Sequence, residues 1–240
     1  MAPFPRYAIY YAPALGSSLD QFGTEMLGYD AWIGAALPFP GDVVERMPDW
    51  RELSDDPRKY GFHATLKAPF HLAKDADEPA LIDALPAFCR SVESVPAFVP
   101  IVAALAGFIA IVPAAADPAI DRLAADCVTA FDRFRVPMSA QDRDRRVVGL
   151  TERQASNLDR WGYPFVFDDF RLHLTLTGGL GADRHAVVLA YLRDRFAAAW
   201  GARPVPVDRI ALLRQDRPNG RFLVICHAAI GAARVSKMLI

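Results

Sequence analysis

The sequence Tyr60-Gly61-Phe62-His63-Ala64-Thr65-Leu66 contains, from Phe62 onward, a strict alternation of apolar and polar side chains. The same alternation returns in Leu172-His173-Leu174-Thr175-Leu176. Successive side chains of a β-strand point to opposite faces, so a period of two is typical of a strand with one buried face. We therefore predict a strand over Tyr60–Leu66 and a second strand within Phe165–Thr177.

Both stretches contain one tetrad, seen as His63-Ala64-Thr65-Leu66 and as His173-Leu174-Thr175-Leu176. With five His, six Thr and 23 Leu in 240 residues, chance would supply roughly 0.01 such tetrads. Residues i and i+2 of a strand share a face, so each His projects beside its Thr. Lys67 would continue the first of these faces and Thr177 the second. If the two strands lie side by side, two imidazoles and two hydroxyls meet in one cleft.

Two imidazoles in one cleft suit the acid–base cleavage of a phosphodiester. Histidine has an ordinary pKa near 6.5, so one ring can take a proton from water while the other donates a proton to the leaving oxygen. Threonine hydroxyls can donate hydrogen bonds to the phosphate oxygens, and Lys67 could add a positive charge. This scheme requires no metal ion.

Two other interpretations of the tetrads remain open. A His-x-Thr pair in a strand also occurs on an ordinary half-exposed sheet face, although the duplication argues against this interpretation. Two distant histidines could instead bind a metal ion, but the sequence offers no clear third ligand.

The sequence resembles the two-histidine (2H) phosphoesterase superfamily, whose signature is a pair of His-x-Thr/Ser-x motifs, one in each lobe. Within it, the chain is most similar to the phosphonate-metabolism proteins found with carbon–phosphorus lyase genes. Three stretches carry this closer likeness: Arg6–Pro13, Tyr60–Phe70 and Phe170–Gly178. The resemblance spans nearly the whole chain.

The resemblance implies one bilobal α+β domain over residues 1–240, with two similar lobes of antiparallel sheet, outer helices and a central cleft. It implies a cyclic phosphodiesterase without metal or other cofactor, in which His63 and His173 are the acid–base pair and Thr65 and Thr175 hold the phosphate. A ribose cyclic phosphate from phosphonate breakdown and a 2′,3′-cyclic nucleotide would each fit. A non-catalytic module that binds a nucleotide or an RNA end in the same cleft is the alternative. The sequence does not decide which histidine is the acid.

Further residues are weaker candidates for contact with the substrate. Besides Lys67 and Thr177, they are two tyrosines and one glutamine near the ends of predicted strands: Tyr11, Tyr60 and Gln215. The Arg143–Arg146 cluster has two interpretations, a solvated charged segment and a lid over the cleft.

The composition limits the choice of partners. The chain has 27 Lys and Arg against 28 Asp and Glu, so its formal net charge is −1. No overall positive field would attract a long nucleic acid, whereas a few local groups could hold a small phosphorylated substrate. The three cysteines, at positions 89, 127 and 226, form no CxxC pair and are expected to be buried thiols. The sequence gives no sign of the oligomeric state.

The uncharged stretch Val95–Ala116 is long enough to cross a bilayer. Its prolines and Gly107 instead favour two short strands, Ile101–Leu105 and Phe108–Val112, around a turn. Met1–Arg6 lacks the basic and apolar segments of a secretory signal, so we expect a cytoplasmic protein without a membrane anchor.

Strand and helix patterns alternate irregularly along the chain, which predicts an α+β class rather than a parallel α/β sheet. Helical spacing or capping residues predict helices at 17–27, 49–54, 78–92, 118–134, from Thr151 onward and at 183–200. Strands are expected at Arg6–Tyr11 and in a C-terminal hairpin, 205–214 with 221–230, around the turn residues 217–220.

Overall fold

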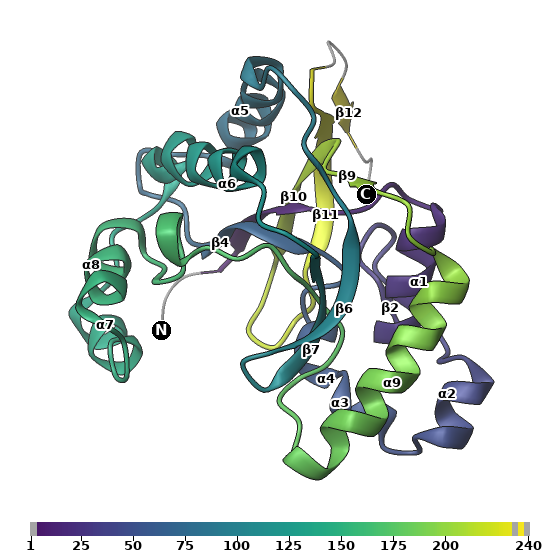
Figure 1. Cartoon of the computed structure of the whole chain (residues 1–240). Coiled ribbons are helices and arrows are strands. Elements are labelled where there is room, and N and C mark those ends of the chain that lie inside the picture. The colour runs from purple at the N-terminus through teal and green to yellow at the C-terminus, as the bar shows by residue number, and fades with distance from the viewer. Residues whose placement is uncertain (1–3, 232–234, 238–240) are drawn as a thin grey trace.

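The computed structural model describes residues 4–231 and 235–237, and it contains one large antiparallel sheet (Figure 1). The first three residues of the N-terminal segment considered above lie outside the described part. The strand order across the sheet is β12-β11-β10-β1-β4-β8-β7-β6. The bounds are β1 Arg6–Tyr11, β4 Ala64–Phe70, β6 Pro100–Leu105, β7 Phe108–Pro113, β8 Leu174–Thr175, β10 Arg209–Gln215, β11 Leu223–Ala229 and β12 Val235–Lys237.

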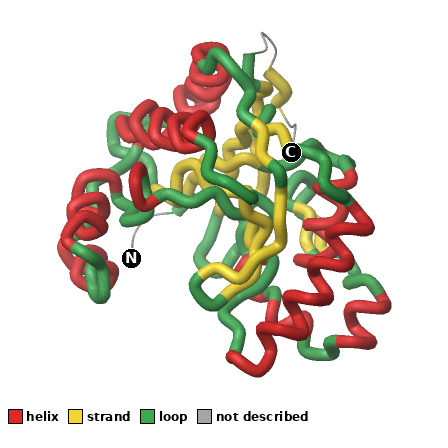
Figure 2. Tube along the Cα trace, viewed as in Figure 1, coloured by secondary structure: helices red, strands yellow, loops and turns green. Residues whose placement is uncertain are grey.

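Helices surround this sheet (Figure 2). Their bounds are α1 Ser18–Leu27, α2 Gly41–Arg46, α3 Trp50–Leu53, α4 Asp55–Arg58, α5 Glu78–Ser91, α6 Pro118–Ala130, α7 Ala140–Arg146, α8 Glu152–Trp161 and α9 Ala182–Ala199. One face of the sheet is covered by packing of α6 on β4, α5 on β10 and β11, and α9 on β6. The largest hydrophobic core lies between these helices and the sheet. On the opposite face, a smaller core packs Tyr29, Ala31 and Trp32 against residues of β1, β10 and β11.

The α+β class predicted from the sequence is confirmed. The resemblance implied a separate sheet in each lobe. The structure instead has one continuous sheet, in which β4 and β8 join the two halves. These two strands share one register pair, Ala64 opposite Leu174. The junction is therefore narrow, and it lies within the two His-x-Thr tetrads.

Local sequence signals placed most helices correctly. Asp117 accepts a hydrogen bond from the Ala119 amide at the start of α6, and Thr151 and Gln154 form the expected capping box of α8. Helix α7 was not predicted, because its residues are highly charged and none of them is buried. Ser139 caps the start of α7, and an ion pair between Arg143 and Asp159, which no periodicity reveals, joins it to α8.

The predicted strand boundaries around the tetrads were shifted. Strand β4 begins at Ala64 rather than at Tyr60, and it continues through Pro69, where the pairing with β1 is irregular. Proline is tolerated at such an irregularity because the ladder does not need its missing N–H. Strand β8 is only two residues long. Both histidines therefore lie immediately before a strand rather than inside it.

The uncharged segment forms the predicted hairpin of β6 and β7, which turns at Ala106 and Gly107. Strand β7 is largely buried, but β6 is the last strand of the sheet and Ile101 is 43% exposed. The prediction of two buried strands is thus correct for β7 alone. Among the described helices, none is long and apolar enough to cross a membrane. All three cysteines are buried, as predicted.

Candidate active site

The register pair Ala64–Leu174 places the two tetrads around one point. Both side chains are fully buried on the helix-covered face. One step along each antiparallel strand, His63 comes opposite Thr175 and Thr65 comes opposite His173. Diagonal neighbours in such a pair lie roughly 7–8 Å apart, so both imidazoles can reach one phosphate group. The two His-Thr pairs are related by a local two-fold axis through this register pair.

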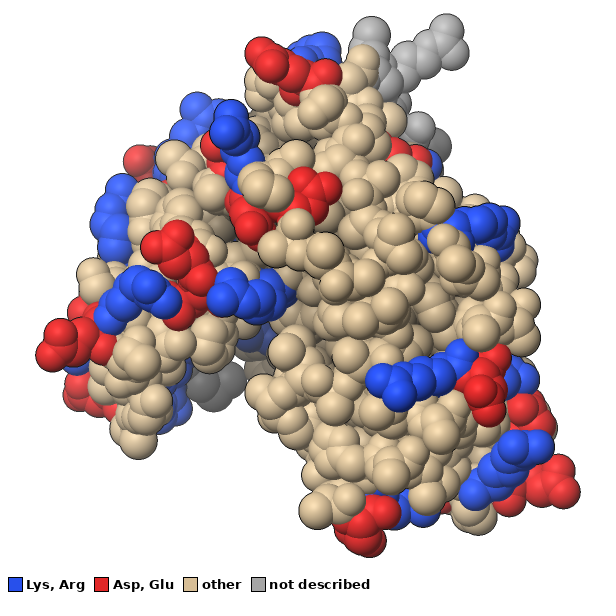
Figure 3. Space-filling model, in the orientation of Figure 1, with Lys and Arg blue, Asp and Glu red and all other residues tan. Residues whose placement is uncertain are grey.

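A cleft of about 460 Å³ opens over these residues. It is lined by Tyr10, Asp56, Pro57, Lys59, Tyr60, His63, Thr65, Ala68, Pro69, Phe108, Tyr163, His173, Thr175, Thr177, Gly178 and Gly179. Tyr163 follows α8 and Phe108 begins β7, so the cleft lies between the α7–α8 arm and the β6–β7 hairpin. The surface is hollowed there, and Lys and Arg side chains border the hollow (Figure 3). All four tetrad residues predicted to be catalytic line this one cleft.

The same backbone hydrogen bond holds each imidazole. His63 Nδ1 lies 2.9 Å from the carbonyl oxygen of Gly61, and His173 Nδ1 lies 2.7 Å from that of Arg171. A carbonyl oxygen can only accept a hydrogen bond, so Nδ1 is the protonated nitrogen in both neutral rings. Each Nε2 is consequently the atom with a free lone pair, available for proton transfer.

Gly61 is required for the bond that holds His63. Its φ of +74° lies in the left-handed region, and an added Cβ would lie 2.4 Å from the Ala31 Cβ. A side chain at this position would therefore be strained by both the backbone conformation and the contact. The turn at Gly61 directs its carbonyl toward the His63 ring two residues later.

His63 is enclosed by aromatic rings. Its ring stacks on Tyr10 at 3.8 Å between centroids, with Tyr60 at 6.0 Å. Burial is the largest influence on this ring and lowers its pKa to about 4, with a smaller contribution from His173, while the Gly61 carbonyl acts in the opposite direction. The electrostatic effect of His173 also indicates that the two rings are close.

His173 has a different neighbour. Its ring lies 5.6 Å from Phe108, and burial lowers its pKa, while the hydrogen bond to the Arg171 carbonyl raises it. Burial therefore favours the neutral form of both imidazoles in the unliganded protein. A phosphate anion between them would favour the protonated form of either ring, because an opposite charge raises the pKa of a histidine.

The threonines lie within reach of the same space. Thr65 Oγ1 is 3.2 Å from His63 Nε2, and Thr175 is partly exposed in the cleft. Thr177 also lines the cleft, but its hydroxyl donates to the Gly178 carbonyl and accepts from the Ile109 amide. The hydroxyl of Thr177 is thus held in the turn after β8, and its expected contact with substrate stays a prediction.

Lys67 is not in the cleft, and the expectation that it continues the His-Thr face is wrong. Tyr10 pairs with Thr65 while Ile9 pairs with Lys67, so Leu66 is an extra residue in β4. Such a bulge reverses the alternation, and it directs Lys67 to the helix-covered face. There its ammonium donates to the Val128 carbonyl at 3.0 Å and lies 3.3 Å from Asp132.

Of the two adjacent tyrosines of β1, Tyr10 lines the cleft and the expected Tyr11 does not. Tyr11 lies in the core with Ile9, whereas Tyr10 lies on the cleft face. The signal was present in the sequence: Arg6 is charged, so residues 6, 8 and 10 form the polar face of this strand. Tyr60 lines the cleft as expected, and Phe108 and Tyr163 are aromatic residues of the cleft that the sequence analysis missed.

Gln215 does not line the cleft, and its amide instead connects two segments of the protein. Its Oε1 accepts a hydrogen bond from Arg6 Nε at 2.7 Å, and its Nε2 donates to the Gly220 carbonyl at 2.6 Å. The side chain therefore orients Arg6 rather than contacting the cleft. The Arg143–Arg146 cluster belongs to α7, which packs beside α8 through Arg143 and Asp159.

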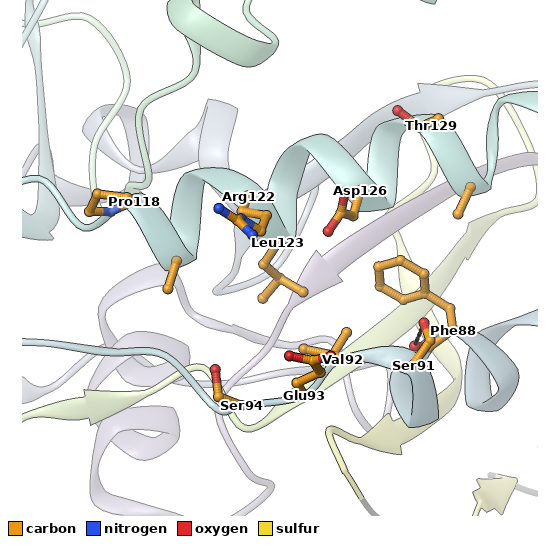
Figure 4. A pocket seen from close by; sticks show the side chains of 12 residues that line it. Phe88, Ser91, Val92, Glu93, Ser94, Pro118, Arg122, Leu123, Asp126 and Thr129 are labelled. Carbon is orange, nitrogen blue, oxygen red and sulfur yellow. Dashed lines mark hydrogen bonds between the residues drawn. The ribbon is translucent and has the colours of Figure 1, made fainter.

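A second groove, of about 670 Å³, lies between α5 and α6 (Figure 4). Leu123 of α6 and Val92 at the end of α5 point toward one another across it, flanked by Arg122, Asp126 and Glu93. It contains no histidine and no residue of the tetrads. Within the described residues, no group of three or more His, Cys, Asp or Glu side chains is arranged to hold a metal ion.

A family model described as "Protein of unknown function (DUF1045)" matches residues 65–223, which is more than half of the chain. The chain belongs to this family. The DUF1045 match contains Thr65, His173 and Thr175, and it begins two residues after His63.

Two curated relatives carry the name ribose 1,5-bisphosphate phosphokinase PhnN. The chain is 35% identical over 226 residues to the protein of Janthinobacterium sp. (strain Marseille) and 32% identical over 217 residues to that of Laribacter hongkongensis (strain HLHK9). These matches cover 91% and 90% of this chain but 49% and 50% of the relatives. The chain thus spans about half the length of the curated relatives it matches.

Among solved structures, the chain is similar to ATU0111, a conserved protein of unknown function from Agrobacterium tumefaciens str. C58. The TM-score is 0.45 at 13% sequence identity, and the superposition covers 97% of this chain and 88% of that chain.

Proposed function

We propose that the protein is a phosphodiesterase that opens a small cyclic phosphate, with His63 and His173 as its acid–base pair. One observation carries the proposal: the two imidazoles flank a single register pair, and each is held through Nδ1 by a backbone carbonyl. This arrangement leaves each Nε2 with its lone pair for proton transfer at one phosphate, once the Thr65 hydroxyl, 3.2 Å from His63 Nε2, turns to the phosphate. The resemblance to the 2H phosphoesterases supports the same assignment.

The reaction follows from these positions. One neutral imidazole takes a proton from water as the water oxygen attacks phosphorus, and the P–O bond of the cyclic ester breaks. The other imidazole, in its protonated form, gives its proton to the leaving oxygen, so a phosphomonoester and a free hydroxyl are formed. Thr65 and Thr175 donate hydrogen bonds to the non-bridging oxygens, whose negative charge grows during attack.

The relatives support a phosphorylated ribose as the substrate class, since their name refers to ribose 1,5-bisphosphate. A ribose cyclic phosphate would fit a cleft of about 460 Å³ and the phosphonate-metabolism setting that the resemblance suggests. The kinase activity in that name is not what this cleft supports. The chain has no Gly-x4-Gly-Lys-Ser/Thr sequence, with which one large class of kinases binds nucleotide phosphates.

The direct test is a panel of ribose cyclic phosphates and 2′,3′-cyclic nucleotides, assayed with the wild type and with His63→Ala and His173→Ala. We expect each variant to lose at least about 100-fold in kcat, because each proton transfer is then left to water. Circular dichroism and product binding serve as controls for folding and for an intact cleft. Unchanged turnover in either variant would contradict the mechanism, and binding without turnover by the wild type would favour a binding module.

A further inference from the structure

Three tyrosines, Tyr10, Tyr60 and Tyr163, line the cleft that contains the two histidines. None of their hydroxyls forms a hydrogen bond with a residue in the described part of the chain. Three of the four tyrosines outside the cleft differ in this respect. Their hydroxyls donate at 2.7–2.8 Å: Tyr7 to Glu78, Tyr29 to the Phe222 carbonyl and Tyr191 to Asp42. Three hydroxyls that are available to a ligand are thus gathered in one cleft.

Tyr10 is the most enclosed of the three. It lines the cleft although it is only 1% exposed, and its ring stacks on His63 at 3.8 Å between centroids. Its register partner on β4 is Thr65, so Tyr10 lies on the same face of the sheet as the His63–Thr65 pair. A buried hydroxyl normally has a hydrogen-bond partner. Since no described residue supplies one to Tyr10, we expect the partner to be a molecule bound in the cleft.

The rings of Tyr10 and Tyr60 are already packed against other rings. Tyr60 stacks on Phe222 at 5.4 Å and lies 6.0 Å from His63, and Tyr10 is too enclosed to expose a second face. A nucleobase that stacks on a protein needs a free aromatic face. A phenol hydroxyl, in contrast, can donate one hydrogen bond and accept another. These two residues therefore offer a ligand their hydroxyls rather than their ring faces.

Tyr163 comes from the α7–α8 arm, which is anchored to the sheet through Asp132. This carboxylate accepts hydrogen bonds from Arg135 Nε at 2.9 Å, from Arg160 Nη1 of α8 at 2.9 Å and from Lys67 Nζ of β4 at 3.3 Å. Arg135 also donates to the Arg160 carbonyl at 2.9 Å. Tyr163 follows Arg160 by three residues, so these bonds hold its position in the cleft wall relative to β4.

We propose that the hydroxyls of Tyr10, Tyr60 and Tyr163 bind the free hydroxyl groups of a sugar whose cyclic phosphate lies between the histidines. This inference rests on the proposed function and adds the substrate class, the cyclic phosphate of a sugar with unsubstituted hydroxyls in place of a nucleobase. Three phenol hydroxyls suit such a ligand, because each can donate to one sugar oxygen and accept from another. A substrate without these hydroxyls would leave the tyrosine hydroxyls unpaired, and sites built to bind a hydroxyl discriminate strongly against such analogues.

The test compares three probes that share a five-membered ring and a cyclic phosphate. They are D-ribose 2,3-cyclic phosphate, which has free hydroxyls, 1,4-anhydroerythritol 2,3-cyclic phosphate, which has none, and adenosine 2′,3′-cyclic phosphate, in which a base replaces a hydroxyl. We expect the wild type to prefer the ribose probe over the hydroxyl-free probe by at least about tenfold in kcat/KM. Tyr10→Phe, Tyr60→Phe and Tyr163→Phe should each reduce this ratio, and the triple variant should bring it close to one. Tyr11→Phe, the next residue of β1 but in the core, is the matched control and should retain the ratio.

The outcomes separate this proposal from the proposed function. A ratio near one in the wild type, or a full ratio in the triple variant, would overturn the role of the tyrosines while turnover itself upholds the phosphodiesterase. A preference for the adenosine probe over the ribose probe would also overturn it, in favour of a site for a base. If no probe is turned over, the proposed function fails, and calorimetry with the ribose probe decides on the tyrosines. Weaker binding by the triple variant than by Tyr11→Phe would then support their role, and equal binding would contradict it.

Discussion

The His63 and His173 sides of the cleft hold their imidazoles by the same hydrogen bond but surround them differently. His63 stacks on Tyr10, and burial lowers its pKa to about 4. His173 lies beside Phe108, and burial lowers its pKa as well. The shared hydrogen bond determines which nitrogen faces the cleft, while the surroundings determine how tightly each ring holds a proton. In both rings burial is the main cause of the lowered pKa, so the entry of an anionic substrate would favour the protonated form of either one.

The largest expected difference between the two sides is the loss of stability when a glycine is replaced by alanine. Gly61→Ala should destabilise the protein by about 3 kcal/mol, because it combines a left-handed φ with a close contact to Ala31. Gly179→Ala, on the His173 side, meets no atom within 4 Å and should cost less than about 0.5 kcal/mol. Urea denaturation of both variants measures the difference. Equal losses would show that the Gly61 turn is not the constrained element.

The stacking of Tyr10 on His63 provides the second test of the difference between the two sides of the cleft. Tyr10→Leu removes the stacked ring and lets water approach His63, so the pKa of this imidazole should rise from about 4 toward its ordinary value near 6.5. Tyr10→Phe keeps the ring and serves as the control. Titration of the histidine ring protons by NMR measures the shift for each ring separately. A His63 pKa that is the same in both variants would rule out Tyr10 as the cause of its enclosure.

The pH dependence of the reaction tests both sides together. The proposed mechanism requires one neutral and one protonated imidazole, and burial lowers the pKa of both histidines in the unliganded protein. The protonated fraction therefore falls as the pH rises, and kcat/KM should decline by about tenfold per pH unit above pH 6.5. The decline in kcat should begin at higher pH, because bound phosphate raises the pKa of the acid. A kcat/KM that stays constant between pH 6.5 and 8 would contradict this assignment.

The smallest expected effect concerns Lys67, which the sequence analysis placed on the His-Thr face and the structure places on the helix-covered face. Lys67→Met should cost about 1 kcal/mol in stability, since Asp132 retains Arg135 and Arg160 as partners. Turnover should change by less than about threefold, because the ammonium does not reach the cleft. Steady-state kinetics and thermal unfolding measure the two effects. A large loss of turnover with unchanged stability would restore Lys67 to the site.

The sequence predicted those parts of the site that depend on local alternation. His63 and Thr65 share a face because they are two residues apart, and His173 and Thr175 repeat that spacing. The position of Lys67 could not be predicted in the same way, because the bulge at Leu66 exists only in the pairing of β4 with β1. The choice of Tyr11 over Tyr10 was a different error, because the charged Arg6 already indicates that residues 6, 8 and 10 share the polar face of β1.

The contribution of the α7–α8 arm to the cleft wall also could not be predicted, but the reason is different. Tyr163 reaches the cleft because α8 is tied to Asp132, a residue 28 positions before Arg160. That contact is neither periodic nor close in sequence. The fold class was easier to predict, because the hydrophobic periodicity that indicates a strand or a helix is contained within a short stretch of sequence.

The single register pair between β4 and β8 has a mechanical consequence. β6 and β7 share six register pairs and β1 and β10 share five, whereas the two halves of the sheet share one. A rotation of one half about this pair would change the separation of the two imidazoles while leaving each half's own strand pairing intact. A phosphate bound by both His-Thr pairs would resist this rotation, because it would contact both halves of the sheet. If the proposed function is correct, substrate binding would therefore change the rigidity of the whole sheet.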